Sequence, residues 1–128
     1  KLNSNIFYID SAGTGSWHVG NKPDLRSIAV SKTHHIDISN QNARQFTYED
    51  YKNFDHIYVM DQSNKKNVLS LAKTLEDRNK VQLILDELIP NSNLEVPDPY
   101  YDEDQGFENV FQMLDKACES IVYRFLNF

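Results

Sequence analysis

Short apolar runs that alternate with helix-like sequence constrain the fold of this chain more than any other feature. Residues 5–10, 56–60 and 81–85 are short, apolar and β-prone, which predicts three strands. Helix signals fill the stretches between and after them. Strands that alternate with helices build a parallel sheet with right-handed crossovers. The sequence therefore predicts an α/β fold, a doubly wound parallel sheet with helices on both of its faces.

The helices are expected from capping signals and from apolar spacing. Pro23 and Asp24 open a helix that runs to about His34. We place another helix over residues 63–72, directly after the second strand. Thr47 and Thr74 each precede an acidic residue at the capping-box spacing, which predicts short helices. On the first helix, we expect the apolar face to consist of Leu25, Ile28 and Ala29.

The strongest periodic signal lies at the end of the chain, where apolar residues recur every three or four positions after Gly106. This spacing predicts one long amphipathic helix. Its apolar positions are Phe107, Val110, Phe111, Leu114, Ala117, Cys118, Ile121, Val122 and Phe125. Because Cys118 falls on that stripe, we expect its thiol to be buried, with a raised pKa and low reactivity.

Length and charge exclude several classes of protein. With 128 residues, 40% of them hydrophobic, the chain fits a single domain, residues 1–128. The net charge is −6, and the 13 lysines and arginines are scattered, which argues against nucleic-acid binding. We find neither a bilayer-length apolar run nor a signal peptide, and therefore expect a soluble cytoplasmic protein without a membrane partner. We expect no cofactor.

Cysteine and histidine give no sign of a metal site. One cysteine cannot form an internal disulfide, which suits a reducing compartment. The histidines have no metal-ligand spacing, so we interpret them as surface or packing residues. They are His18, His34, His35 and His56.

One carboxylate stands out because two prolines flank it. Pro97 fixes its own φ, and Pro99 pushes Asp98 into an extended conformation, so the carboxylate projects from a stiffened loop. Such a group can act as a general acid. From the local sequence alone, an ordinary surface turn is the more common explanation, since Asp and Pro are frequent turn residues.

The predicted topology favours the functional interpretation. Ligands bind parallel α/β sheets beyond the carboxyl ends of the strands. Three connections would meet there: the loop from Ser11 to Gly20, the turn at Asp61, and the loop that carries Asp98. Trp17 and the aromatic pair Tyr100 and Tyr101 would then lie on one rim with Asp98.

Five segments together resemble the low-molecular-weight protein tyrosine phosphatases. The likeness runs from about Ile6 to Val122, in the order and spacing of that family. The segments are Asp10-Ser11-Ala12-Gly13-Thr14, Trp17-His18-Val19-Gly20, Ala43-Arg44-Gln45, the run from Asp55 to Asp61, and Asp98-Pro99-Tyr100-Tyr101. The resemblance implies the flavodoxin-like fold of that family and hydrolysis of phosphotyrosine in protein or peptide substrates through a cysteinyl-phosphate intermediate.

The resemblance also implies roles for single residues. Asp98 would be the general acid, and then the base that activates water. Trp17 and Tyr100, with Tyr101 beside them, would form the slot for the aryl ring. Ser11 would support the phosphate loop, and Asp61 would have a supporting place at the end of its strand.

The family's first strand and its Cys-x5-Arg phosphate loop, part of a unit of about 30 residues, are not found in these 128 residues. Cys118 and Arg124 have the spacing of the Cys-x5-Arg motif but not its structural setting. This segment falls inside the predicted helix, where the amides are already bonded and no glycine lets them turn toward an anion. We therefore expect the nucleophile to precede Lys1. The chain alone should then be inactive, and its unpaired strand edges should make it unstable or self-associating.

Other functions remain open from the sequence. A non-catalytic phosphatase-like binding module would carry no Cys-x5-Arg loop upstream. A phosphoarginine phosphatase would differ in that same loop. An arsenate reductase needs further cysteines for electron relay, and Cys118 is the only one here.

Overall fold

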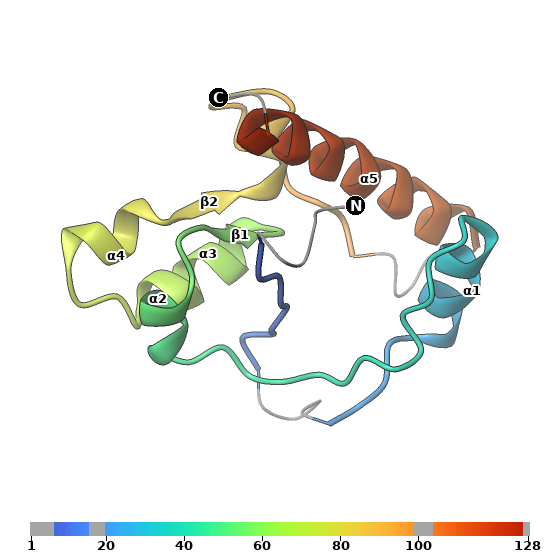
Figure 1. The fold of residues 1–128 in the computed structure, drawn as a ribbon, viewed down its shortest axis with the longest axis horizontal. Coiled ribbons are helices and arrows are strands. Elements are labelled where there is room, and N and C mark those ends of the chain that lie inside the picture. Colours follow the sequence, from blue (N-terminus) through green and yellow to red (C-terminus); the bar gives the residue numbers. More distant parts are fainter. Residues whose placement is uncertain (1–6, 16–19, 99–103, 127–128) are drawn as a thin grey trace.

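The computed structural model describes residues 7–15, 20–98 and 104–126 (Figure 1). Within these ranges no helix is long and apolar enough to cross a membrane. The helices and strands follow the chain in this order: α1 (Leu25–Thr33), α2 (Glu49–Asn53), β1 (Ile57–Val59), α3 (Gln62–Leu69), α4 (Leu75–Asn79), β2 (Val81–Leu83), the 3-10 helix η1 (Ile84–Glu87) and α5 (Asp104–Leu126).

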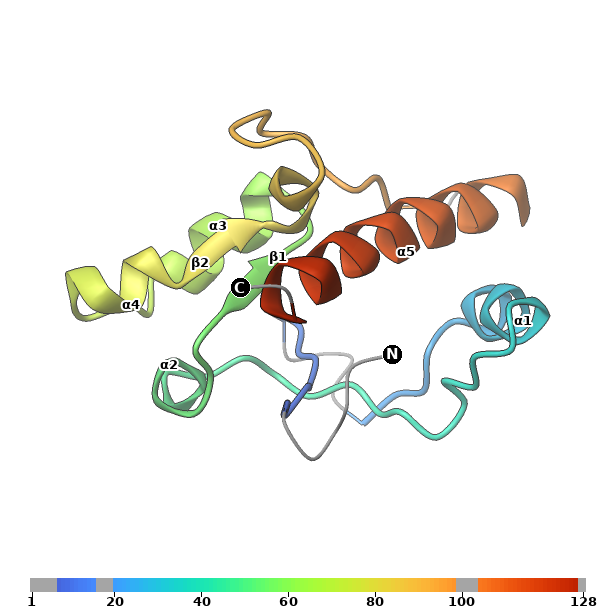
Figure 2. The same ribbon diagram turned by 45° about the horizontal axis from the view of Figure 1, so that its top comes forward.

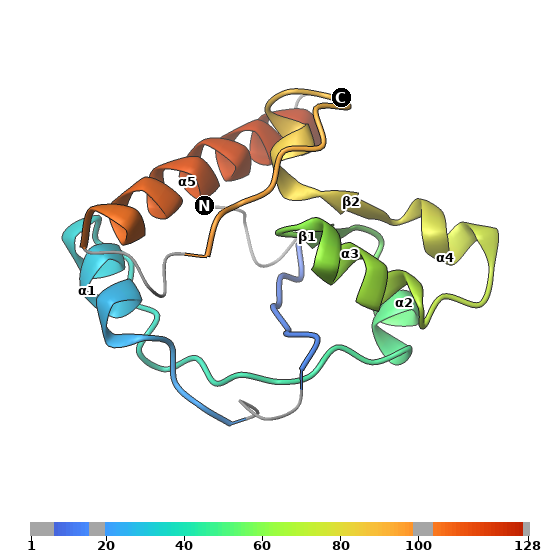
Figure 3. The ribbon, with the colours of Figure 1, turned by 180° about the vertical axis from the view of Figure 1, so that it is seen from behind.

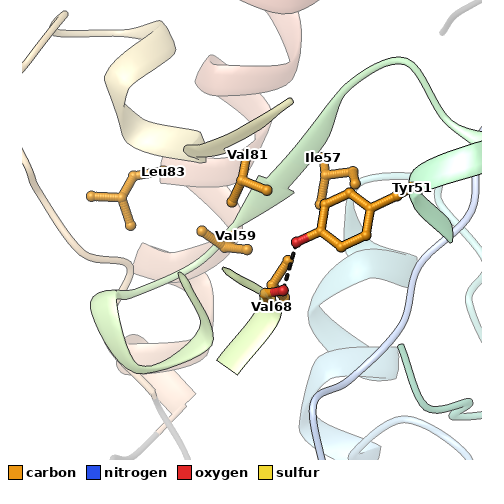
Figure 4. Packing of buried hydrophobic residues seen from close by; sticks show 6 residues of the cluster. All are labelled: Tyr51, Ile57, Val59, Val68, Val81 and Leu83. Atoms are coloured by element: carbon orange, nitrogen blue, oxygen red, sulfur yellow. Dashed lines mark hydrogen bonds between the residues drawn. The ribbon is translucent and has the colours of Figure 1, made fainter. Parts of the chain in front are cut away.

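In the described part of the chain the sheet consists of β1 and β2, which pair in parallel with Ile57 opposite Val81. Alternate residues of both strands are buried on one face of the sheet. Val68 of α3 and Tyr51 of α2 cover that face, and the Tyr51 hydroxyl donates to the Val68 carbonyl oxygen. Figure 4 shows this cluster, which consists of Tyr51, Ile57, Val59, Val68, Val81 and Leu83.

Helix α5 covers the opposite face of the sheet. Tyr58, the middle residue of β1, packs in a second cluster with Ala117 and Ile121 of α5. Figure 2 shows α3 and α5 on opposite sides of the two strands. The predicted arrangement, a parallel sheet with helices on both faces, is confirmed for these elements.

Helix α1 packs on the N-terminal half of α5, away from the sheet (Figures 1 and 3). The Arg26 guanidinium lies 4.3 Å from the centre of the Phe107 ring, and His34 stacks on Phe111 with the ring centres 4.1 Å apart. The apolar face that we predicted for α1 is therefore largely wrong. Leu25 is 81% exposed and Ala29 is exposed as well, because α1 presents Arg26 and His34 to α5 instead.

Two predicted strands are corrected by the structure. Residues 7–10 of the predicted strand 5–10 form no strand, and the nearest sheet-like pairing is a parallel bridge between Gly13 and Gln45, beyond the end of that segment. The strand predicted over 81–85 ends at Leu83 because Ile84 and Leu85 already belong to η1. Both residues are buried, and a short run of buried apolar residues in a 3-10 helix cannot be told from a strand by its sequence.

The helix predictions differ from the structure mainly at the ends. The helix that we placed over 63–72 spans Gln62–Leu69. At Thr74 the predicted capping box is confirmed in both directions. At Thr47 it is not, because Tyr48 is the N-cap of α2, without a side-chain cap.

Candidate active site

Residues 94–98, which lead to Asp98 and which we call the acid loop, are attached to the carboxyl end of β1. The Val96 amide donates to the Met60 carbonyl oxygen at 2.8 Å, one residue beyond the end of the strand. The Val96 side chain is buried in the cluster beneath α5. Asp98 itself is exposed, two residues after this fixed point. The sheet edge therefore holds the base of the acid loop and leaves the Asp98 carboxylate at the surface.

Asp61 lies where the sequence predicted it, between β1 and the following helix. Its carboxylate oxygen Oδ1 accepts from the Asn64 amide at 2.8 Å and caps α3. Met60, its neighbour, contacts the acid loop. Two of the three predicted connections, the turn at Asp61 and the acid loop, thus meet at one end of β1, with Asp61 acting as a helix cap.

Ser11 lies in the extended segment that precedes the bridge at Gly13. Its amide donates to its neighbour Asp10, and the other oxygen of that carboxylate accepts from the Arg44 guanidinium at 3.0 Å. Arg44 also binds Asp50 through two hydrogen bonds of 3.0 Å each. The backbone around Ser11 is thus tied to the segment around Arg44 and to α2.

Sequence reasoning missed this cluster around Arg44, because Asp10 lies 34 residues from Arg44 and no motif links Arg44 with Asp50. Burial raises the pKa of Asp50, but the hydrogen bonds from Arg44 and the Thr47 amide outweigh it, so the pKa lies below its usual value. Hydrogen bonds to Asp50 raise the pKa of Arg44. A cavity of about 560 Å³ lies beside the cluster. Because two carboxylates already neutralise Arg44, this cavity is poorly suited to a phosphate group.

The aromatic residues of the predicted slot, Trp17, Tyr100 and Tyr101, lie outside the described residues. Among the residues that the structure does describe, no group of three or more His, Cys, Asp or Glu side chains could hold a metal ion.

The structure corrects one expectation about Cys118. The segment from Cys118 to Arg124 is helical throughout, as predicted, so its amides serve the helix. The thiol, however, is exposed rather than buried. Ala117 and Ile121 occupy the buried stripe of α5, and one further residue rotates Cys118 by about 100° away from it. The argument against Cys118 as the nucleophile therefore rests on the helical backbone alone.

Comparison with known proteins identifies one family that matches almost the whole chain. Residues 2–126 match the family model of low molecular weight phosphotyrosine protein phosphatase. The Schizosaccharomyces pombe protein of that name is 42% identical over 108 residues, which cover 84% of this chain and 68% of the yeast protein. The human protein is 36% identical over 115 residues, 89% of this chain and 72% of its own length.

Solved structures agree with the sequence comparisons. A protein tyrosine phosphatase from Entamoeba histolytica superposes with a TM-score of 0.82 at 34% identity, over 91% of this chain and 73% of the other. YfkJ from Bacillus subtilis superposes with a TM-score of 0.79 at 32% identity, over 93% and 74%. With a family match across the chain and an acid loop fixed at the end of β1, this chain belongs to the low molecular weight phosphotyrosine protein phosphatase family.

Proposed function

We propose that this protein hydrolyses aryl phosphate monoesters, phosphotyrosine above all, with Asp98 as its general acid and base. The observation that supports this most is the attachment of the acid loop to the end of β1 through Val96, in a chain of this phosphatase family. The attachment holds the base of the loop while Asp98, two residues on, is exposed.

The reaction has two steps. A cysteine thiolate attacks phosphorus, so that an S–P bond forms and the bond from phosphorus to the phenolic oxygen breaks. Asp98 gives its proton to that oxygen as it leaves. In the second step the Asp98 carboxylate takes a proton from a water molecule, whose oxygen attacks phosphorus. The S–P bond breaks, which releases inorganic phosphate and restores the thiolate.

The nucleophile and the anion site belong, in this proposal, to residues that precede Lys1. The helical backbone around Cys118 supports this assignment, since it cannot wrap a phosphate. Ser11 supports the phosphate loop, and its own backbone is held by Asp10, which binds Arg44. Asp61 has a supporting role as the cap of α3. Trp17, Tyr100 and Tyr101 would form the slot for the aryl ring. The 128-residue chain on its own should then show no turnover.

The test uses the full-length protein with para-nitrophenyl phosphate as substrate. Asp98→Ala should lower kcat by a factor of about 10² or more, the usual contribution of a general acid. Asp55→Ala is the matched control, because Asp55 is an exposed aspartate just before β1, at the opposite end of the strand from the acid loop. An Asp98→Ala rate equal to that of the control would end the assignment.

A further inference from the structure

A second contact holds the acid loop, beside the one made by Val96. Oε2 of Glu95 accepts a hydrogen bond from the Gln62 amide at 2.7 Å. Gln62 is the first residue of α3, and the helix already has its own cap in Asp61. The Glu95 carboxylate therefore binds the N-terminus of α3 in addition to its cap, and it comes from a distant part of the chain.

The two contacts constrain the loop in different ways. Val96 is buried and its amide is bonded to Met60, but one point of attachment does not set the direction of the backbone that leads to Asp98. Glu95 adds a second point on the neighbouring residue, at a short charge-assisted hydrogen bond to the positive end of a helix. Only Val96 and Pro97 separate Glu95 from Asp98, and the φ of Pro97 is fixed.

We propose that Glu95 is a positioning residue, which sets the direction of the acid loop by binding the Gln62 amide and so aims Asp98 at the leaving oxygen. This inference rests on the proposed function, because it assumes that Asp98 is the acid. The catalytic group itself remains Asp98, and Glu95 acts through the backbone between them.

The leaving group separates this role from a purely structural one. An ester whose phenolate is already stable, such as 2,4-dinitrophenyl phosphate, needs little help from an acid. Phenyl phosphate needs the proton. If Asp98 is misdirected, kcat/KM must fall for phenyl phosphate and hardly change for the dinitrophenyl ester. A general loss of stability would lower both together.

The contact can be removed from either side. Glu95→Ala deletes the acceptor, whereas Glu95→Gln keeps an oxygen that can still accept. Gln62→Pro deletes the donor, and proline suits the first position of a helix, where its missing amide hydrogen is tolerated. Asp61 before it has φ −148° and ψ 176°, an extended conformation that a following proline permits.

The experiment measures kcat/KM of the full-length protein and its variants for both esters. Glu95→Ala and Gln62→Pro should each lower the value for phenyl phosphate by about tenfold, since small misplacements of a catalytic group have effects of this order or larger. The double variant should lose no more than either single one. Glu95→Gln should keep most of the activity. Glu76→Ala is the matched control, a glutamate in the first turn of α4.

Each result has one meaning. If Asp98→Ala changes the two esters selectively but Glu95→Ala and Gln62→Pro do not, the role of Glu95 is wrong and the proposed function stands. If Asp98→Ala itself shows no selectivity, the proposed function fails. Should Glu95→Ala not fold, Gln62→Pro alone still decides, because an unchanged ratio between the two esters would overturn the inference.

Discussion

Glu87 links the sheet to α5 through a buried carboxylate. Its side chain is 6% exposed. One carboxylate oxygen, Oε1, accepts from the Tyr58 hydroxyl at 2.8 Å and from the side-chain nitrogen Nε2 of Gln82 at 3.1 Å, and it lies 3.0 Å from Nη2 of Arg124. Arg124 also donates to the Tyr58 oxygen at 3.1 Å. The network ties β1, β2 and η1 to the last turn of α5, because each contributes a partner.

Tyr58 makes this network sensitive to alkaline pH. Burial, together with the hydrogen bond to Glu87, raises the pKa of Tyr58 to about 12. The unfolded chain loses the same proton near pH 10. The stabilising effect is therefore complete below pH 10 and is lost as the pH rises from 10 toward 12, because only the unfolded state gains by ionising there.

Tyr58→Phe should lower the free energy of unfolding by about 1 kcal/mol at pH 8, the usual net value of one hydrogen bond. It should also flatten the decline in stability between pH 10 and 12. Urea unfolding at several pH values measures both effects. Tyr123→Phe, an exposed tyrosine on α5, should leave the decline unchanged. An equal decline in the Tyr58 variant and in the parent would contradict this account.

The sequence predicted the position of Asp61, between a strand and the following helix, because near neighbours in the chain set that position. That Asp61 caps the helix was found only in the structure. The burial predicted for Cys118 was wrong, because the apolar residues of α5 cover a wider face of the helix than the face that is buried. Glu95 and Arg44 could not be found, since their partners lie 33 and 34 residues away, at Gln62 and Asp10.

At the scale of the elements, two similar capping signals have different outcomes. In α4 the Thr74 hydroxyl accepts from the Asp77 amide at 3.0 Å, and Asp77 binds back to the Thr74 amide at 3.2 Å. In α2 the corresponding carboxylate, Asp50, accepts from the Thr47 amide but also binds Arg44. Two similar sequence signals thus lead to different caps, because the Asp50 amide donates to the Thr47 carbonyl oxygen at 3.0 Å and not to the Thr47 hydroxyl.

This difference predicts unequal effects of the same substitution. Thr74→Ala should lower the free energy of unfolding by about 1 kcal/mol, the usual loss for a threonine cap. Thr47→Ala, the matched control, should change it much less, since Tyr48 is the N-cap of α2. Thermal or urea unfolding of the two variants measures the difference, and equal losses would contradict the structure.

At the scale of the whole molecule, two clusters on opposite faces of a narrow sheet hold the fold together. The sequence predicted this layering because the apolar runs and the long helix are strong local signals. It overestimated the sheet, since residues 7–10 have strand-like composition but form no strand in the part of the chain that the structure describes. A strand needs a neighbour, and composition does not show whether one is present.

The narrow sheet carries a prediction about the isolated chain. In the described residues β1 pairs with β2 on one side, so its other edge can take up a further strand. On our proposal that the nucleophile and its strand precede Lys1, residues 1–128 alone should self-associate or unfold without a cooperative transition, whereas a protein that carries that segment should be monomeric. Light scattering after gel filtration, with calorimetry, decides this. A monomeric 128-residue chain with one sharp melting transition would contradict it.

The central claim is that the carboxylate held beyond the end of β1 protonates the leaving oxygen. The most direct measurement is the single-turnover rate of phenol release from phenyl phosphate, with the full-length protein in excess over substrate. Asp98→Ala should slow that release by a factor of about 10²–10⁴. Equal rates for Asp98→Ala and the parent would contradict the account.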